Sequence, residues 1–162
     1  MTASNIPPMA SYYADSSVLV KRHVQEVGSL WFIKLADPAS GNVIITAQLS
    51  IVEVFSALNR RRRESSISLA DYTTIATEFA RVVSDEYEIV PPSVKVIDGA
   101  RLLLERHHLR AGDAIQLASA IIANDNLQSA ALTPAIFLSA DERLIAAARA
   151  EGLPTDDPRS HP

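Results

Sequence analysis

The chain has 162 residues, contains no cysteine and carries a net charge of −4. This length suits one domain, and the missing cysteine excludes disulfides and cysteine-based metal or nucleophile sites. The acidic balance counts against a protein whose whole surface binds nucleic acid, because phosphate affinity comes mainly from Lys and Arg.

Short apolar strands alternate with amphipathic helices along the chain. Strands are expected at 12–15, 43–45, 87–90 and 136–138, and helices at 16–20, 27–36, 47–62, 67–83, 94–107, 112–123 and 141–150. A last strand after Leu153 is weak or absent, because this segment holds three prolines. The alternation predicts an α/β sandwich with a mainly parallel central sheet.

The beginning of the chain and its hydropathy predict a soluble cytoplasmic protein without membrane contact. The first fourteen residues carry no side-chain charge and no apolar run, so they lack both parts of a secretory signal. No stretch approaches the roughly 18 apolar residues that a membrane span needs.

Three carboxylates stand alone in apolar segments, and a fourth follows a predicted strand. Asp15, Glu53 and Asp113 have no Lys or Arg near them in their segments, and Asp141 comes after the strand at 136–138. Burying an ionised carboxylate is costly unless it is paired or binds a metal, and gathered carboxylates raise one another's pKa. A hard divalent cation, Mg²⁺ or Mn²⁺, would remove both difficulties.

Helix capping is the open alternative for each of these acids. Asp15 can cap the helix that follows it, and Ser50 with Glu53 has the spacing of a capping box. Asp113 stands at a helix start, where a carboxylate suits the macrodipole, and Asp141 follows Ser139 in a good capping sequence. The metal hypothesis therefore depends on the four acids occurring together.

Four segments resemble the motifs of the PIN-domain family, whose bacterial members include the VapC-type toxins. The segments are Tyr13–Leu19, Ser50–Val54, Leu109–Ala120 and Phe137–Leu144. The resemblance implies a three-layer α/β/α sandwich, with an N-terminal extension at 1–11, a nuclease domain at 12–157 and a flexible tail at 158–162.

The resemblance also implies a Mg²⁺- or Mn²⁺-dependent endoribonuclease that is the toxin of a toxin–antitoxin pair. The implied catalytic and metal-binding residues are Asp15, Glu53, Asp113 and Asp141. The expected substrate-binding residues are Ser16, Ser139, Arg110, Lys21 and Arg22. The implied partners are an RNA substrate, a cognate antitoxin and a second copy of the chain.

Basic residues near these acids have two interpretations. Lys21 and Arg22 follow the first acid, Arg110 precedes the third, and four arginines close the helix at 47–62. They are either solvated helix ends or a basic border that attracts RNA phosphates. Trp31 and Phe32 are expected to be packing residues or part of an antitoxin-binding surface on the helices at 17–36 and 47–62.

Two other classes of protein remain as alternatives. A non-catalytic RNA- or protein-binding module on the same fold would use the acids as caps. A phosphotransfer enzyme of the haloacid-dehalogenase or receiver type also places an Asp at a strand end. The dehalogenase pattern requires a second Asp where Ser17 stands, and a receiver requires a late Lys that the region after Leu138 lacks.

Overall fold

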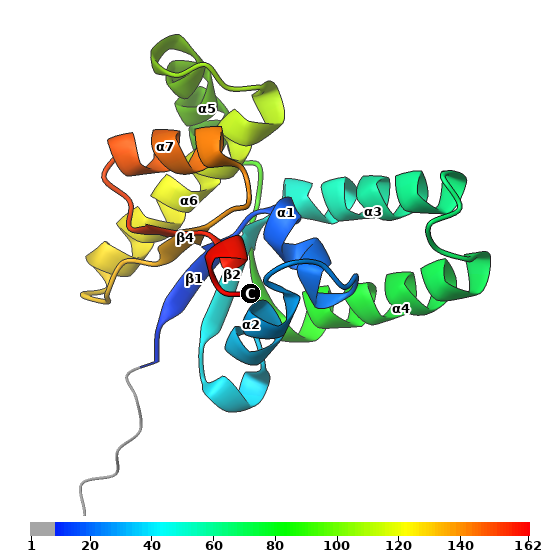
Figure 1. The fold of residues 1–162 in the computed structure, drawn as a ribbon. Helices are drawn as coiled ribbons and strands as arrows, with labels where there is room; N and C mark the ends of the chain where they lie inside the picture. Colours follow the sequence, from blue (N-terminus) through cyan, green and yellow to red (C-terminus); the bar gives the residue numbers. More distant parts are fainter. Residues whose placement is uncertain (1–8) are drawn as a thin grey trace, which may run out of the picture.

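The structure, a computed structural model, describes residues 9–162 and contains a five-stranded parallel sheet between two layers of helices (Figure 1). The strands are β1 (Ser11–Ala14), β2 (Val43–Ala47), β3 (Tyr87–Val90), β4 (Ile136–Leu138) and β5 (Thr155–Asp156). Their order across the sheet is β3-β2-β1-β4-β5, and every neighbouring pair is parallel. The expected α/β/α sandwich with a parallel sheet is confirmed.

Seven α-helices and three short 3₁₀ turns connect and follow the strands of the described part. The helices are α1 (Ser16–Leu19), α2 (Ser29–Leu35), α3 (Gln48–Arg63), α4 (Leu69–Glu86), α5 (Val94–Arg106), α6 (Ala111–Ser129) and α7 (Glu142–Ala150). The turns are η1 (Val20–Arg22), η2 (Pro38–Ser40) and η3 (Pro158–Ser160). None of the helices in residues 9–162 is long and apolar enough to cross a bilayer.

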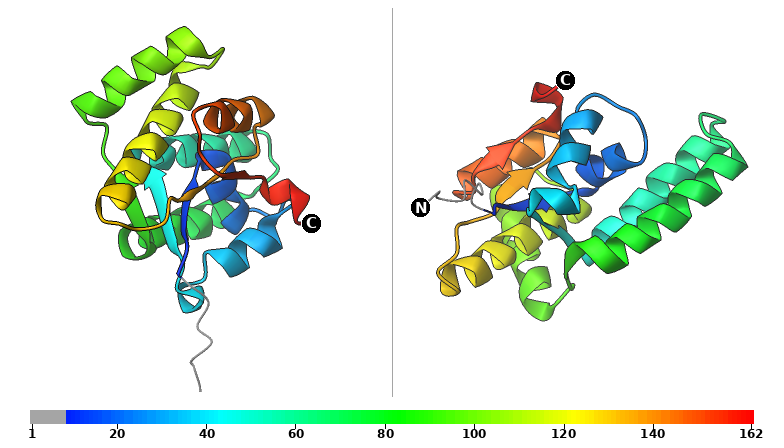
Figure 2. Two further views of the ribbon diagram at one scale, coloured as in Figure 1. Left: turned by 90° about the vertical axis from the view of Figure 1, so that its left-hand side faces the viewer. Right: turned by 90° about the horizontal axis from the view of Figure 1, so that it is seen from below.

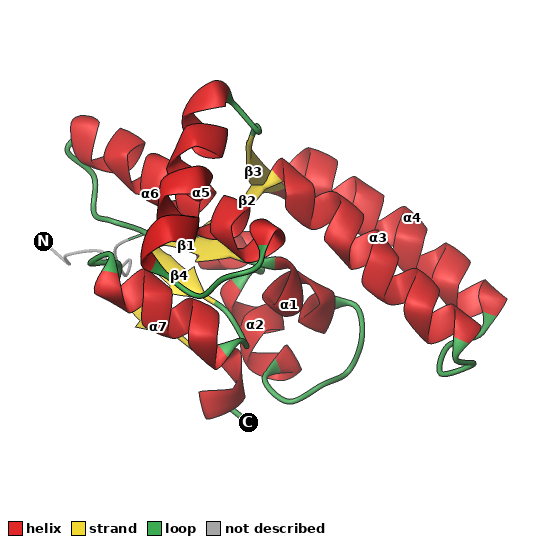
Figure 3. Cartoon of the chain, turned by 90° about the horizontal axis from the view of Figure 1, so that it is seen from above, coloured by secondary structure: helices red, strands yellow, loops and turns green. Residues whose placement is uncertain are grey.

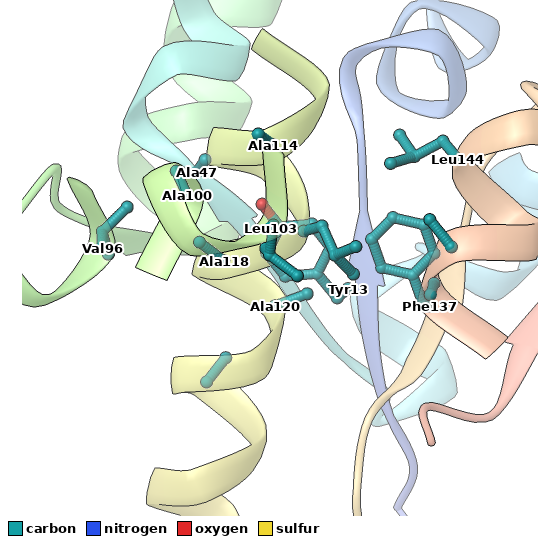
Figure 4. Close-up of a cluster of buried hydrophobic side chains, with 14 of the residues drawn as sticks. Tyr13, Ala47, Val96, Ala100, Leu103, Ala114, Ala118, Ala120, Phe137 and Leu144 are labelled. Atoms are coloured by element: carbon teal, nitrogen blue, oxygen red, sulfur yellow. The ribbon is translucent and has the colours of Figure 1, made fainter. Parts of the chain in front are cut away.

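Alternate residues of each strand point to opposite faces of the sheet and so build two separate cores. Tyr13 and Phe137 stack at 5.5 Å between ring centroids in the core under α5, α6 and α7 (Figure 4). Ala14 and Leu138 belong to the core under α1 to α4. The two further views in Figure 2 show helices on both sides of the sheet.

Helices α3 and α4 lie side by side and extend beyond the edge of the sheet (Figures 1 and 3). The N-terminus of α4 carries the capping box expected from the sequence, in which Ser68 and Asp71 bond reciprocally to each other's backbone. The pair therefore forms an arm with the four arginines at 60–63 near its outer end.

Helix α6 is longer than expected, because it continues past Ala123 to Ser129. Asn124 is buried in this extension, and its side chain accepts a hydrogen bond from the Ala135 N–H at 2.7 Å and donates one to the Ala135 carbonyl. The polar side chain that follows the expected helix end at Ala123 is thus satisfied by the chain that leads into β4.

The structure describes the C-terminal end of the chain but not its first eight residues. Residues 1–8 of the predicted extension at 1–11 lie outside the described residues. At the other end, the weak last strand is present as β5, and the segment at 158–162 is placed against α2, with Pro158 buried.

Candidate active site

The strand order places a crevice beyond the carboxyl ends of β1 and β4. The chain leaves β1 toward β2 on one side of the sheet and reaches β4 on the other, so the order reverses between these two strands. Ligands of parallel sheets bind at such a reversal. Asp15 follows β1 directly, and its N–H donates to the Leu138 carbonyl at the end of β4.

Two serines join the ends of these strands around the Asp15 carboxylate. Ser17 Oγ donates to Asp15 Oδ1 at 2.6 Å and accepts from the Ala140 N–H. Ser139 Oγ donates to Asp15 Oδ2 at 2.6 Å and accepts from the Asp141 N–H. The carboxylate is therefore held from both strand ends, with both of its oxygens hydrogen-bonded.

Asp15 is the only acidic residue of the described chain that is fully buried, with 4% of its surface exposed. Burial raises the pKa of Asp15 to about 6, and the charge of Glu53 adds to this rise. Hydrogen bonds from Ser139, Ser17 and the Val18 N–H oppose it. No described Lys, Arg or His forms an ion pair with Asp15.

Glu53 lies in the second turn of α3 and reaches the first turn of α6. Its Oε2 accepts a hydrogen bond from Gln116 Nε2 at 2.7 Å. Its Oε1 lies beside Gly112, where an added Cβ would come within 2.9 Å of it. The capping box that Ser50 and Glu53 could have formed is absent, because α3 begins at Gln48 with Ala47 as its N-cap.

Asp113 and Asp141 both cap helices in the described structure. Asp113 Oδ2 accepts from the Arg110 N–H at the start of α6. Asp141 Oδ1 accepts from the Arg143 and Leu144 N–H groups at the start of α7. Each keeps its other carboxylate oxygen without a hydrogen bond to residues 9–162.

The four acids do not form a ready-made cluster. Within residues 9–162, no three Asp, Glu, His or Cys side chains are gathered closely enough to hold a metal ion. Their oxygen-only donor chemistry and the unpaired burial of Asp15 nevertheless suit a hard divalent cation. The structure links Asp15 with Asp141 through Ser139, and Glu53 with the helix start that bears Asp113.

A polar cleft of about 720 Å³ opens beside Glu53, the one of the four acids that lines it. Its walls come from α1, η1, α3 and the start of α6, and include Ser16, Ser17, Lys21, Glu26, Glu53, Arg60, Arg61 and Arg110. An apolar pocket of about 420 Å³ between β3 and α6 contains none of the four acids.

The expected substrate-binding residues separate into two groups. Ser16, Lys21 and Arg110 line the cleft, whereas Ser139 is fully buried and donates a hydrogen bond to Asp15. Arg22 does not line it, because its guanidinium is held by Glu86 at 2.5 Å and by the Tyr87 hydroxyl. A substrate-binding role for Arg22 stays a prediction, and its ion pair with Glu86, 64 residues away in the sequence, would have to open for it.

The sequence analysis missed two residues, Gln116 beside Glu53 and Glu26 in the wall of the cleft. Gln116 was detectable as a lone amide in the apolar start of α6, three residues after Asp113. Glu26 was not, because it stands in a polar loop and its cationic partners, Lys21 and Arg61, are recognised only in three dimensions.

The aromatic pair of α2 has packing roles in the structure. Phe32 is buried in the core under α1 to α4. Trp31 stacks face to face on the His161 ring at 4.3 Å between centroids. Antitoxin contact by Trp31 stays a prediction.

The sequence matches the PIN domain family over residues 12–150. The chain belongs to the PIN domain family. No curated protein matches the sequence.

Solved structures of PIN-like proteins have the same fold at low sequence identity. VapBC2 from Rickettsia felis, in a structure bound to a promoter DNA fragment, is 14% identical with a TM-score of 0.60, covering 91% of this chain and 98% of that one. VapC20 from Mycobacterium tuberculosis, described as a Sarcin-Ricin loop cleaving toxin, is 17% identical with a TM-score of 0.58, covering 88% and 95%. A toxin–antitoxin complex from Klebsiella pneumoniae is 16% identical with a TM-score of 0.57, covering 91% and 97%.

Proposed function

We propose that this PIN-domain protein is a metal-dependent endoribonuclease and the toxin of a toxin–antitoxin pair. The observation that carries the proposal is the Asp15 carboxylate, buried where the strand order reverses and lacking any cationic partner among the described residues. A buried carboxylate without a counter-charge is costly, and a bound divalent cation would supply that counter-charge.

Asp15, Glu53, Asp113 and Asp141 are the residues proposed to hold Mg²⁺ or Mn²⁺. When bound, such an ion supplies an activated water and neutralises charge on the scissile phosphate. Ser139 and Ser17 orient the Asp15 carboxylate through its two oxygens. Asp113 and Asp141 are fixed through one oxygen each by their helix starts, which leaves the other oxygen available.

RNA is the proposed substrate because Glu53, one of the four acids, lines a cleft that also holds several basic side chains. Arg60 and Arg110 line this cleft and form no ion pair with residues 9–162, so both guanidinium groups are available to phosphates. Lys21 and Arg61 add charge beneath them, although Glu26 binds both. An RNA substrate agrees with the proposed cytoplasmic location.

An antitoxin and a second copy of the chain are the proposed protein partners. One of the structural neighbours is a toxin–antitoxin complex from Klebsiella pneumoniae. Leu30 of α2, Val52 of α3 and Val27, just before α2, expose apolar side chains, and Val52 lines the cleft. Exposed apolar side chains beside a binding cleft favour a partner that covers them.

A non-catalytic binding module is the second candidate, because Asp15, Asp113 and Asp141 each accept hydrogen bonds from a helix start. In that case the acids would be structural, and the cleft would bind RNA or protein without cleaving it. Metal affinity separates the two candidates.

The deciding experiment is calorimetric titration of Mn²⁺ into antitoxin-free protein. Wild type is compared with Asp113→Asn and with Asp125→Asn, a control on the exposed far end of the same helix. The nuclease proposal expects wild type and Asp125→Asn to bind and Asp113→Asn to lose binding while remaining folded. No binding by wild type, even with a model RNA present, would favour the non-catalytic module.

A further inference from the structure

A chain of buried polar groups runs under Glu53 from the core to the cleft. The Tyr13 hydroxyl donates to Gln116 Oε1 at 2.8 Å. Gln116 Nε2 then donates to Ser50 Oγ at 2.8 Å and to Glu53 Oε2 at 2.7 Å. Both amide hydrogens and the amide oxygen of Gln116 are therefore engaged, and the residue is 2% exposed.

The orientation of this amide is fixed by its neighbours. A Glu53 carboxylate oxygen can only accept, so it requires the NH₂ group of Gln116 on its side. The amide oxygen then faces Tyr13, whose hydroxyl donates to it. Reversing the amide would bring two oxygens together at Glu53, so the network specifies one arrangement.

Helix α6 approaches Glu53 at two points. Gly112, in the first turn, leaves room for Glu53 Oε1, which a side chain there would displace. Gln116, one turn later, holds Glu53 Oε2. Residues three apart share a helix face, so Asp113 lies on the face of α6 from which Gln116 contacts Glu53.

We propose that Gln116 is a positioning residue that holds the Glu53 carboxylate in place for a divalent cation. An amide suits this role because it fixes one carboxylate oxygen without neutralising the charge, which a Lys or Arg in the same place would do. Oε1 is left without a hydrogen bond from residues 9–162. This inference rests on the proposed metal-dependent function.

The test compares Gln116→Met with Tyr13→Phe by Mn²⁺ calorimetry on folded protein. Methionine fills a similar volume but cannot donate to Glu53. Phenylalanine removes the other end of the same network and leaves the bond between Gln116 and Glu53 intact. We expect Gln116→Met to weaken Mn²⁺ binding about 10-fold, as outer-shell substitutions do, and Tyr13→Phe to change it less than about 2-fold.

The same network supplies a control variant that separates loss of stability from loss of Mn²⁺ binding. Gln116→Met leaves the Tyr13 hydroxyl buried without its partner, so the double variant Tyr13→Phe with Gln116→Met is made as well. Removing both partners of a buried hydrogen bond is much less disruptive than removing one. The double variant should melt closer to wild type than Gln116→Met and keep the weakened Mn²⁺ binding.

The outcomes separate this inference from the proposed function. Equal Mn²⁺ affinity in wild type and Gln116→Met, or equal loss in Gln116→Met and Tyr13→Phe, would overturn the positioning role and leave the nuclease proposal standing. Failure of wild type to bind Mn²⁺ would overturn both.

Discussion

Two buried charges, Lys21 and Asp15, are compensated in different ways. Lys21 and Asp15 each have 4% of their surface exposed. Lys21 pairs with Glu26 at 3.1 Å, and Glu26 also binds Arg61. The Asp15 carboxylate only accepts hydrogen bonds, from two hydroxyl groups and one N–H of the described residues.

The difference shows where the chain supplies its own counter-charge. On the Lys21 side the charges are balanced within the protein, as buried ions require. On the Asp15 side the carboxylate is oriented but not neutralised, and burial keeps its pKa raised to about 6. A site that orients a charge without balancing it is suited to a ligand of opposite sign.

The largest expected effect is that of Asp15→Asn on metal-free protein. Between about pH 4 and pH 6 the folded wild type binds more protons at Asp15 than the unfolded chain does, so its stability falls as the pH rises through this window. Asparagine does not titrate. At pH 7.5 the variant should be more stable by about 3 kcal/mol, the equivalent of about two pKa units.

This effect is measured by urea unfolding with EDTA at pH 4 and pH 7.5. The advantage of Asp15→Asn should be small at pH 4 and constant above pH 6.5. Added Mn²⁺ should stabilise wild type and leave the variant unchanged. A pH-independent difference in stability between the two proteins would mean that folding does not raise the pKa of Asp15.

Glu26→Gln tests the other side of the comparison. It leaves the buried ammonium of Lys21 without an acid, and we expect a loss of about 2 kcal/mol, since Glu26 is partly exposed. Combining it with Lys21→Met should recover most of the loss. Additive effects in this double-mutant cycle would show that the pair does not interact.

Ser139→Ala removes one of the hydroxyl groups that donate a hydrogen bond to the Asp15 carboxylate. It should raise the pKa of Asp15 further, because the hydrogen bond to Oδ2 favours the ionised form. Mn²⁺ affinity should fall about 10-fold, which calorimetry detects. Ser129→Ala, which removes a hydroxyl at the far end of α6, is the control and should have no effect on Mn²⁺.

Arg60→Ala has the smallest expected effect. An exposed guanidinium contributes modestly and is screened by salt, so RNA affinity should fall about 3-fold at low ionic strength and less at high. Filter binding with a non-cleavable RNA measures this. Arg63→Ala, on the same helix but outside the lining of the cleft, should bind RNA like wild type.

Local sequence patterns predicted most of the fold. The strands at 87–90 and 136–138 have the expected bounds, because each is a short apolar run with clear limits. The end of α6 was misplaced because Asn124 looks like a helix stop and is satisfied only by Ala135, eleven residues later.

The candidate site was predictable where its signal is local. An acid in an apolar segment stands out in the sequence, so Asp15, Glu53 and Asp113 could be named. Pairing between distant residues leaves no such signal, so the ion pair of Arg22 with Glu86 could not be predicted, and the substrate role of Arg22 stays a prediction. The metal role of all four acids remains a prediction.

The last residues of the chain pack against α2 and the loop before it. Gly28 has a left-handed backbone with φ of +86°, and an added Cβ there would lie 2.3 Å from the Pro158 carbonyl oxygen. His161 covers Trp31 a few residues further on. A purification tag or fluorescent protein fused after Pro162 would thus begin beside the loop that carries Glu26, and metal and RNA binding are best measured after such a fusion has been cleaved off.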